Sequence, residues 1–375
     1  MTVLTNARLV LGDEVILGTV TIDGTVIGDV VRGASGAGAI DLDGDYLIPG
    51  VVDVHTDNLE RQVQPRSNAR WPSRSAMIAH DAQCAAAGVT TVLDALCLGD
   101  LGFEKDRVRT FHDAVTDLDA LADTGLLKAE HFLHLRCELP ASDMLGLVDP
   151  VAEHKRVRMI SLMDHSPGVG QYADLERYRA LRRKDGVADA FIDRHIVELQ
   201  ANREMLREPN RRWLLDRVAG LGVVLASHDD RTEEEVAQNA ADGIRVSEFP
   251  VTMAAALAAK ARGMQVIAGA PNIVRGGSHS GNVAAADLVR AGAVDAFASD
   301  YVPASLIEAA FICAADAQIS LPEAVALISD RPARMAGLPD RGRIEAGLRA
   351  DLVRVRVHDG LPVVRQVWRA GERVI

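Results

Sequence analysis

The chain has 375 residues, of which 48% are hydrophobic and 25% charged, and its formal net charge at pH 7 is −12. This length and composition suffice for a large buried core, since a barrel of alternating strands and helices commonly uses about 250 residues. The acidic balance argues against a broad basic surface for nucleic-acid phosphates, although it leaves room for a local pocket of arginines.

Both ends of the chain predict short β-strands. Apolar and polar side chains alternate from Thr2 to Ile27 between glycine-rich turns, and alternation returns from Ala350 to Ile375 around a turn at Asp359-Gly360. Two β-rich ends around a long middle suggest that the termini pair. We predict a small β-sandwich domain from residues 1–47 and 342–375, and a second domain from residues 48–341.

The middle of the chain changes character, because apolar strands alternate there with helical patterns. This order is typical of βα units around a parallel sheet, and eight strands are what a closed barrel needs. The charged stretch at about 170–217 exceeds a typical connection, so we expect a helical insertion over the barrel mouth whose ion pairs form a solvated face. The fold class is therefore α/β, a distorted (β/α)8 TIM barrel. Its predicted strands are 50–57, 90–96, 131–139, 158–165, 223–228, 244–249, 265–270 and 293–300.

Polar side chains gather where these strands end. His55 and Asp57 leave the first strand on one face, because side chains alternate with period two. The carboxyl ends of barrel strands converge on one mouth, where active sites lie. For His55, Asp57, His165 and His228 we favour metal ligation over a role in capping loops or fixing turns.

The remaining strand-end groups support the same site. A buried Glu138 needs compensation from a metal or from Arg136, and Asp300 is expected to be a metal-linked catalytic base rather than a helix cap. His134 and Glu248 stay open between core and site. His80 lies in a predicted helix, which favours a structural or supporting role.

The segment from Gly269 to Asn282 predicts anion binding. It combines glycine pairs, which let backbone amides approach a ligand, with polar and cationic side chains, although such a loop is often only a flexible connection. Arg66 after the first strand adds a cation, with a plain surface arginine as the alternative. The candidate substrate-binding residues are Arg66, Arg136, Asn272, Arg275, Ser278, His279 and Ser280.

With these motifs the chain resembles the amidohydrolase superfamily, and more narrowly the PhnM-type diphosphatases of the carbon-phosphorus lyase pathway. The resemblance spans nearly the whole chain, and its most specific part runs from Asn272 to Asn282. The other matching segments are 55–60, 80–81, 134–140, 161–168, 226–230, 299–305 and 340–342.

The resemblance implies a metal-dependent hydrolase that cleaves α-D-ribose 1-methylphosphonate 5-triphosphate to the 5-phosphate and pyrophosphate. It implies one or two divalent ions, zinc first, while a carboxylate-rich set leaves manganese as an alternative. The implied ligands, with Glu138 bridging two ions, are His55, Asp57, Glu138, His165, His228 and Asp300. The superfamily pattern expects ligand histidines on strands five and six, whereas our count puts His165 and His228 on strands four and five.

Two other functions stay open at this point. Hydrolysis of a C–N bond, in a cyclic amide or N-acyl group, would use similar site chemistry, but the Arg275 loop favours a phosphate ligand. A metal-bearing subunit that only scaffolds other proteins is the second. A homodimer is also left open.

The sequence further predicts a cytoplasmic protein. The segment from Met1 to Leu11 lacks a basic stretch followed by an apolar one, and no run of about 18 apolar residues occurs, so we expect no membrane partner. The four cysteines form no CxxC pair and are expected to be reduced and mostly buried. They are Cys84, Cys97, Cys137 and Cys313.

Overall fold

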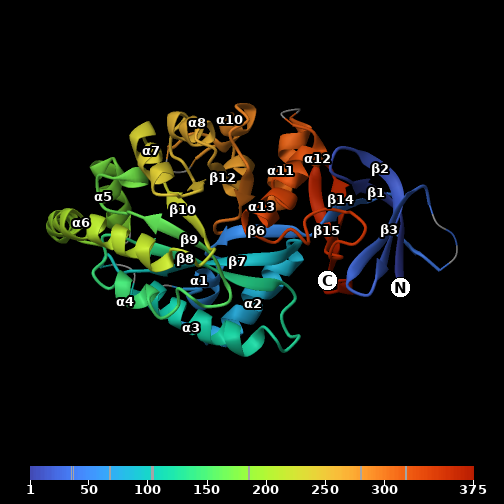
Figure 1. Ribbon diagram of the computed structural model, residues 1–375, viewed down its shortest axis with the longest axis horizontal. Helices are drawn as coiled ribbons and strands as arrows, with labels where there is room; N and C mark the ends of the chain where they lie inside the picture. The colour runs from blue at the N-terminus through green and yellow to red at the C-terminus, as the bar shows by residue number, and fades with distance from the viewer. Residues whose placement is uncertain are drawn as a thin grey trace.

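The computed structural model describes residues 1–34, 36, 38–66, 69–102, 105–184, 186–278, 281–316 and 319–375. Within this part of the chain, the eight predicted barrel strands all form and pair in parallel in sequence order (Figure 1). Their order confirms the predicted α/β barrel. The strands are β6 (Val51–Thr56), β7 (Val89–Leu98), β8 (Glu130–Glu138), β9 (Val157–Met163), β10 (Val224–His228), β11 (Val246–Glu248), β12 (Gln265–Gly269) and β13 (Ala296–Ala298).

The barrel is nearly closed between its first and last strands. Thr56, the last residue of β6, and Asp300, two residues after β13, form a parallel bridge. The Asp300 N–H donates to the His55 carbonyl at 3.0 Å, and the Asp57 N–H donates to the Asp300 carbonyl at 2.8 Å. Closure therefore brings the strand ends that carry His55, Asp57 and Asp300 together.

Helices cover the outside of the barrel. Helix α2 ends before Gly88, which has φ +87° and whose Cβ, if present, would lie 2.7 Å from the Ile307 side chain, so that glycine suits this position. The helices outside the insertion are α1 (Asn58–Val63), α2 (Ser73–Ala86), α3 (Lys105–Leu121), α4 (Met144–Val148), α7 (Glu233–Ala241), α8 (Met253–Ala261), α9 (Ala270–Val274), α10 (Ala285–Arg290), α11 (Ser305–Ala315), α12 (Leu321–Ala326) and α13 (Asp330–Met335).

The two ends of the chain build one continuous mixed sheet, in the order β16-β15-β14-β5-β1-β2-β3, with β4 paired to β1. Antiparallel pairing of β5 with β14 joins the N-terminal strands to the C-terminal ones. The predicted pairing of the termini is thus confirmed. The strands are β1 (Thr2–Val10), β2 (Val15–Asp23), β3 (Val26–Arg32), β4 (Ile40–Asp41), β5 (Tyr46–Pro49), β14 (Leu352–His358), β15 (Leu361–Arg369) and β16 (Glu372–Arg373).

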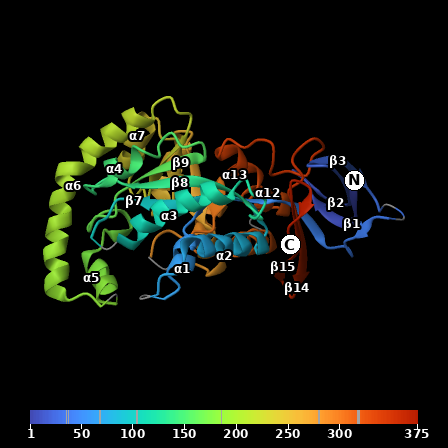
Figure 2. The same ribbon diagram turned by 90° about the horizontal axis from the view of Figure 1, so that it is seen from below.

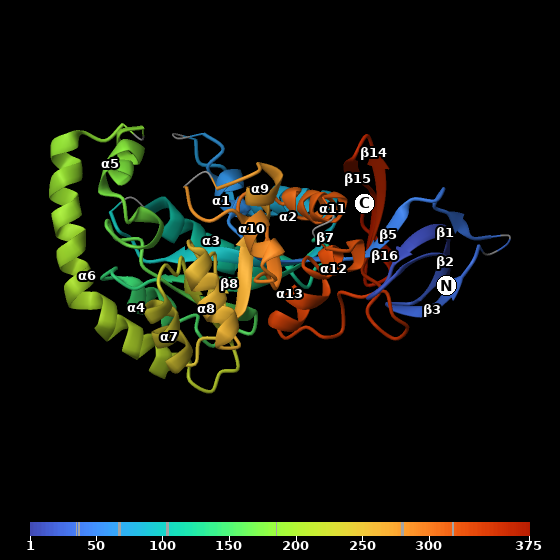
Figure 3. The same ribbon diagram turned by 90° about the horizontal axis from the view of Figure 1, so that it is seen from above.

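Between β9 and β10 the chain forms a short 3-10 turn, η1 (Gly170–Tyr172), and two helices, α5 (Leu175–Lys184) and α6 (Asp189–Val218). These helices lie at the end of the molecule opposite the terminal sheet (Figures 2 and 3). Their polar composition is consistent with a surface position. Among the described helices, none is both long and apolar enough to cross a bilayer.

Candidate metal centre at the barrel mouth

A fully buried carboxylate, Glu248 at the end of β11, holds two histidines of the predicted site. Its Oε1 lies 2.8 Å from His55 Nδ1, and its Oε2 lies 2.8 Å from His228 Nδ1. Because a carboxylate only accepts, both rings donate from Nδ1 and keep Nε2 as the atom for a ligand. Burial alone would raise the pKa of Glu248, but the charges of His55 and His134 and the bonds from the rings hold it well below its usual range.

The third histidine is held in the same manner by Glu138 at the end of β8. His165 donates its main-chain N–H to Glu138 Oε1 at 2.6 Å and its ring Nδ1 to Oε2 at 2.8 Å. The buried Nε2 atoms of His55 and His165 have no hydrogen-bond partner. Histidines whose Nδ1 is held by a carboxylate while Nε2 is left open are typical of metal ligands.

Asp229, directly after β10, completes a group that can hold a metal ion. Its Oδ2 lies 3.8 Å from His165 Nε2 and 4.0 Å from His228 Nε2, and it too is buried without a hydrogen-bond partner. The ligand atoms of these three residues lie within 4.8 Å of one another. Nitrogen and carboxylate oxygen atoms that are buried without a hydrogen-bond partner fit a divalent cation. Without such an ion these atoms would stay buried and unpaired, which is costly.

Three residues at the strand ends adopt left-handed backbone conformations. Asp229, Phe249 and Asp300 have φ values of +56°, +54° and +56°. Their N–H groups nevertheless continue the barrel ladder, donating to the carbonyls of Glu248, Ile267 and His55 at 2.9, 2.9 and 3.0 Å. This conformation is uncommon outside glycine and persists where the surrounding structure fixes it. The chain therefore turns sharply at each of these strand ends, at the edge of the candidate site.

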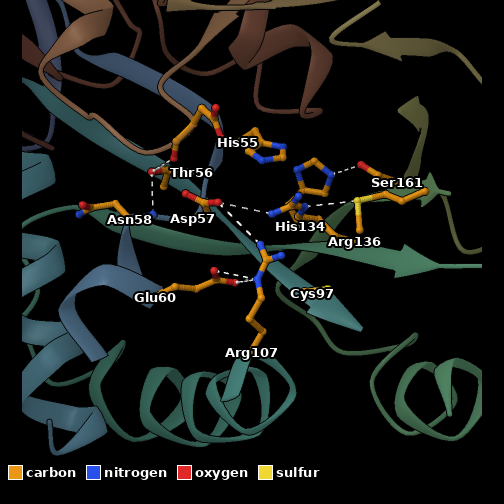
Figure 4. Close-up of polar contacts among 12 residues, drawn as sticks. His55, Thr56, Asp57, Asn58, Glu60, Cys97, Arg107, His134, Arg136 and Ser161 are labelled. Atoms are coloured by element: carbon orange, nitrogen blue, oxygen red, sulfur yellow. Dashed lines mark hydrogen bonds and ion pairs between the residues drawn. The ribbon is translucent and has the colours of Figure 1, made fainter. Parts of the chain in front are cut away.

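Asp57 faces two arginines (Figure 4). Its Oδ2 lies 3.6 Å from Arg136 Nη1 and 3.8 Å from Arg107 Nη2. Burial raises the pKa of Asp57, and the nearby charge of Asp300 raises it further. In the described structure Asp57, Glu138 and Asp300 lie outside the clusters that can bind a metal, so their ligation remains a prediction.

His134 and Ser161 form a buried chain of polar contacts that ends at the Glu248 carboxylate. His134 Nδ1 donates to the Val54 carbonyl at 3.0 Å, its Nε2 contacts Ser161 Oγ (Figure 4), and Ser161 Oγ lies 2.8 Å from Glu248 Oε2. Burial lowers the pKa of His134 to about 3. Both residues that the sequence left open, His134 and Glu248, thus belong to the framework of this site.

A second buried cluster lies between helix α2 and strands β7 and β8. Asp94 accepts from His80 Nε2 at 2.7 Å and from His131 Nδ1 at 2.8 Å, while His131 Nε2 lies 3.2 Å from Asp81. Asn58, the residue after Asp57, contacts His80 Nδ1 at 3.0 Å through its side-chain amide nitrogen. This contact links the cluster to the strand end that carries Asp57. Because these ring nitrogens all have hydrogen-bond partners, the cluster forms a buried polar network, and the supporting role of His80 stays a prediction.

Two cavities meet at the mouth. One, of about 160 Å³, is lined by His55, His228 and Asp229 together with the loop after β12. The other, of about 270 Å³, is lined by Asp57, Glu138 and His165. The residues that line both are Arg136, Gln171, Asp300 and Tyr301. The candidate base Asp300 therefore lies where the cavities join.

The predicted substrate-binding residues fall in different places. Asn272, Arg275 and Ser278 line the first cavity, although the Asn272 side chain also holds its loop by accepting the Ala285 N–H at 3.0 Å. Arg66 is exposed and lies outside the linings of both cavities. His279 and Ser280 lie outside the described residues.

Some site residues were not among the predicted ligands or substrate contacts. Asp229 follows His228 at a strand end, but periodicity alone does not choose it over Asp230, whose carboxylate instead accepts from Ser247 at 2.6 Å. Gln171 lies in a connection where the sequence shows no pattern that marks a ligand contact, and Tyr301 lies in the matching segment 299–305, to which the resemblance assigns no role besides that of Asp300.

Comparisons with known proteins place the chain in a family. A model described as "Amidohydrolase family" matches residues 228–375. The chain is also 41% identical, over 376 residues covering 99% of it and 100% of the relative, to α-D-ribose 1-methylphosphonate 5-triphosphate diphosphatase from Escherichia coli (strain K12). The chain belongs to the amidohydrolase family.

Solved structures share the fold of this amidohydrolase. Dihydropyrimidinase from Brevibacillus agri matches with a TM-score of 0.65 and 14% identity, covering 100% of this chain and 95% of that one. A mutant N-acetyl-D-glucosamine-6-phosphate deacetylase from Mycobacterium smegmatis matches with a TM-score of 0.64 and 18% identity, covering 100% and 99%. Identities this low show the barrel and its terminal sheet but not the substrate. The structure also confirms our strand count, because His165 follows the fourth barrel strand and His228 ends the fifth.

Proposed function

We propose that this amidohydrolase hydrolyses α-D-ribose 1-methylphosphonate 5-triphosphate to the 5-phosphate and pyrophosphate. The observation that carries the proposal is that one cavity joins the buried histidine–carboxylate centre to the loop bearing Asn272, Arg275 and Ser278. A phosphate chain needs a cationic side chain such as the Arg275 guanidinium, whereas a neutral amide substrate does not. The similarity to a full-length diphosphatase supports the same assignment.

The residues fit one or two divalent ions. His165, His228 and Asp229 would hold the first through two Nε2 atoms and Oδ2. A second would take His55, Asp57 and Asp300, because barrel closure joins the strand ends that carry them, and His55 Nε2 is buried without a hydrogen-bond partner. Imidazole nitrogens favour zinc, and the carboxylates keep manganese as an alternative.

Glu138 takes a different role in this proposal from the bridging ligand that the resemblance implies. Both of its oxygens accept hydrogen bonds from His165, at 2.6 and 2.8 Å. We assign Glu138 to orienting His165, as Glu248 orients His55 and His228.

A bound divalent ion would lower the pKa of a water from about 15.7 towards 7, so that hydroxide is available near neutral pH. Asp300, where the cavities join, takes the water proton. The water oxygen forms a bond to the phosphorus nearest the ribose, while the bond from that phosphorus to the oxygen shared with the next phosphate breaks and releases pyrophosphate. Arg136 and Arg275 face the negative charge that accumulates on the phosphate oxygens.

The test is release of pyrophosphate by protein loaded with zinc or manganese. We expect pyrophosphate and the 5-phosphate in equal amounts, and no ammonia or amine from dihydropyrimidines or N-acetylated sugar phosphates. An absence of pyrophosphate with folded, metal-loaded protein would contradict the proposal. Turnover of a C–N substrate alone would favour the alternative hydrolase, and turnover of neither would favour a scaffolding subunit.

A further inference from the structure

The second cavity carries its own cationic groups. Arg107, Arg136 and Arg182 line it, and they come from three different parts of the fold: α3, β8 and the inserted helix α5. Arg275 lines the first cavity and not this one. The proposed site therefore has arginines on both sides of the point where Asp300 lies.

A line of aromatic side chains connects the candidate metal ligands to Arg182. The ring centroids of His165 and Tyr172 lie 5.9 Å apart, and those of Tyr172 and Tyr178 lie 5.4 Å apart. The guanidinium carbon of Arg182 lies 5.1 Å from the centre of the Tyr178 ring. Tyr178 is 2% exposed and stands one helical turn before Arg182, so the inserted helix is anchored with this arginine on its inner side.

Two neighbouring arginines of α5 lie outside this cavity. Arg179 pairs with Glu176 and Asp193 at 2.8 and 2.9 Å, and Arg183 pairs with Asp189 at 2.6 Å. Neither lines the second cavity. The inserted helix stands beside α6 at the end of the molecule (Figure 3). Its Arg182 lines the second cavity, whereas Arg179 and Arg183 pair with carboxylates at the surface.

The barrel side of the cavity is also suited to an anion. Arg107 is held by both oxygens of Glu60 at 2.8 Å (Figure 4). Arg136 Nη1 is buried and makes no hydrogen bond, with its nearest carboxylate oxygen, on Asp57, 3.6 Å away. A buried donor of this kind is costly unless a ligand satisfies it.

We propose that the second cavity binds a second anionic group of the substrate, a compact phosphonate or phosphate at the end of the sugar opposite the triphosphate. This inference rests on the proposed function, which makes the group the methylphosphonate on C1 of the ribose. Arg182 is its specificity-determining contact. The triphosphate then extends towards Arg275, and the reacting phosphorus lies near Asp300. The cavity of about 270 Å³ selects against nucleoside triphosphates, whose base at the same carbon is larger and carries no negative charge.

The test compares two substrates that differ only at C1. The value of kcat/KM is measured for α-D-ribose 1-methylphosphonate 5-triphosphate and for ribose 5-triphosphate, whose C1 carries a hydroxyl. We expect the wild type to prefer the phosphonate, and Arg182→Gln to reduce the ratio of the two kcat/KM values about tenfold to a hundredfold, as for loss of one charge-assisted contact. Arg182→Lys should retain part of the preference. Arg183→Gln, on the same helix and paired at the surface, is the matched control and should leave the ratio unchanged.

Binding of the product, ribose 1-methylphosphonate 5-phosphate, is measured by calorimetry as a readout independent of turnover. We expect weaker binding to Arg182→Gln than to Arg183→Gln, with circular dichroism confirming that both are folded. An equal loss on both triphosphates would place Arg182 on the triphosphate side and overturn the proposal, as would an unchanged ratio. Failure of the proposed function would look different, since neither triphosphate would then release pyrophosphate from any variant.

Discussion

Glu248 Oε1 lies 2.8 Å from His55 Nδ1, although 193 residues separate the two in the chain. The other oxygen of the same carboxylate holds His228 at the same distance. One buried acid thus sets the ring orientation of two histidines on strands β6 and β10. The orientation of both candidate ligands depends on Glu248, although Glu248 itself need not contact a metal. Its two oxygens are already occupied as acceptors for the two rings.

Replacing Glu248 with glutamine should weaken metal binding. The amide nitrogen of Gln cannot accept the Nδ1 proton, so one histidine loses its fixed orientation. We expect metal affinity to fall about tenfold to a hundredfold, with a matching loss of kcat/KM. Calorimetric metal titration measures this, and Glu233→Gln on the exposed face of α7 is the control. Unchanged affinity in a folded variant would remove Glu248 from this role.

Asp300→Asn should reduce turnover about a hundredfold to ten-thousandfold, because the amide cannot take the proton of the attacking water. The main-chain bonds of Asp300 to His55 and Asp57 do not involve the side chain, so barrel closure should survive. Steady-state kinetics and metal analysis of the same preparation check both points. Turnover at the wild-type rate would rule out Asp300 as the base.

Removing the metal should lower thermal stability, because an ion that binds only the folded state stabilises it by mass action. An ion present at a hundred times its Kd contributes about 2.7 kcal/mol. We expect chelation to lower Tm by several degrees and zinc to restore it. His165→Asn should remove most of this difference, whereas His112→Gln at an exposed site should keep it. An identical Tm with and without chelator would argue against a resident ion.

The network around His131 predicts a loss of stability at alkaline pH. Burial disfavours the charged ring, but the charge of Asp94 and bonds to Asp94 and Asp81 outweigh burial and raise the pKa of His131 to about 9. The raised pKa means that this stabilisation is complete below about pH 6.5, the ordinary histidine value, and is lost as pH rises through 9. At most about 3 kcal/mol is involved.

Urea unfolding at pH 6.5 and pH 9, with chelator present, measures this contribution. We expect the free energy of unfolding to fall between the two values in the wild type, and to fall less in His131→Gln, which is already destabilised at pH 6.5. His358→Gln, whose side chain is 82% exposed, should behave like the wild type. An equal fall in His131→Gln would assign the pH dependence to other groups.

The barrel was predictable from the sequence because its signals are local. Apolar runs such as Val51 to Val54 and Thr90 to Val92 mark strands, and their alternation with helical patterns fixes the order of a parallel sheet. The same patterns place His55, His165, His228 and Asp300 at strand ends, and barrel geometry then requires that they share one mouth.

Which carboxylate orients a histidine and which one faces the metal site was not predictable in this way. Glu138 and Asp229 are both acids near strand ends, yet the first accepts two bonds from His165 and the second turns an unpaired oxygen towards the ring nitrogens. Such roles depend on distances of about 3 Å between strands far apart in the chain. Sequence periodicity therefore determined the helices and strands and which of their faces meet. Register, barrel closure and the left-handed turns at Asp229 and Asp300 decided which atoms meet. Only the tertiary structure could decide this, because the strength of hydrogen bonds and metal ligation changes over tenths of an ångström in distance.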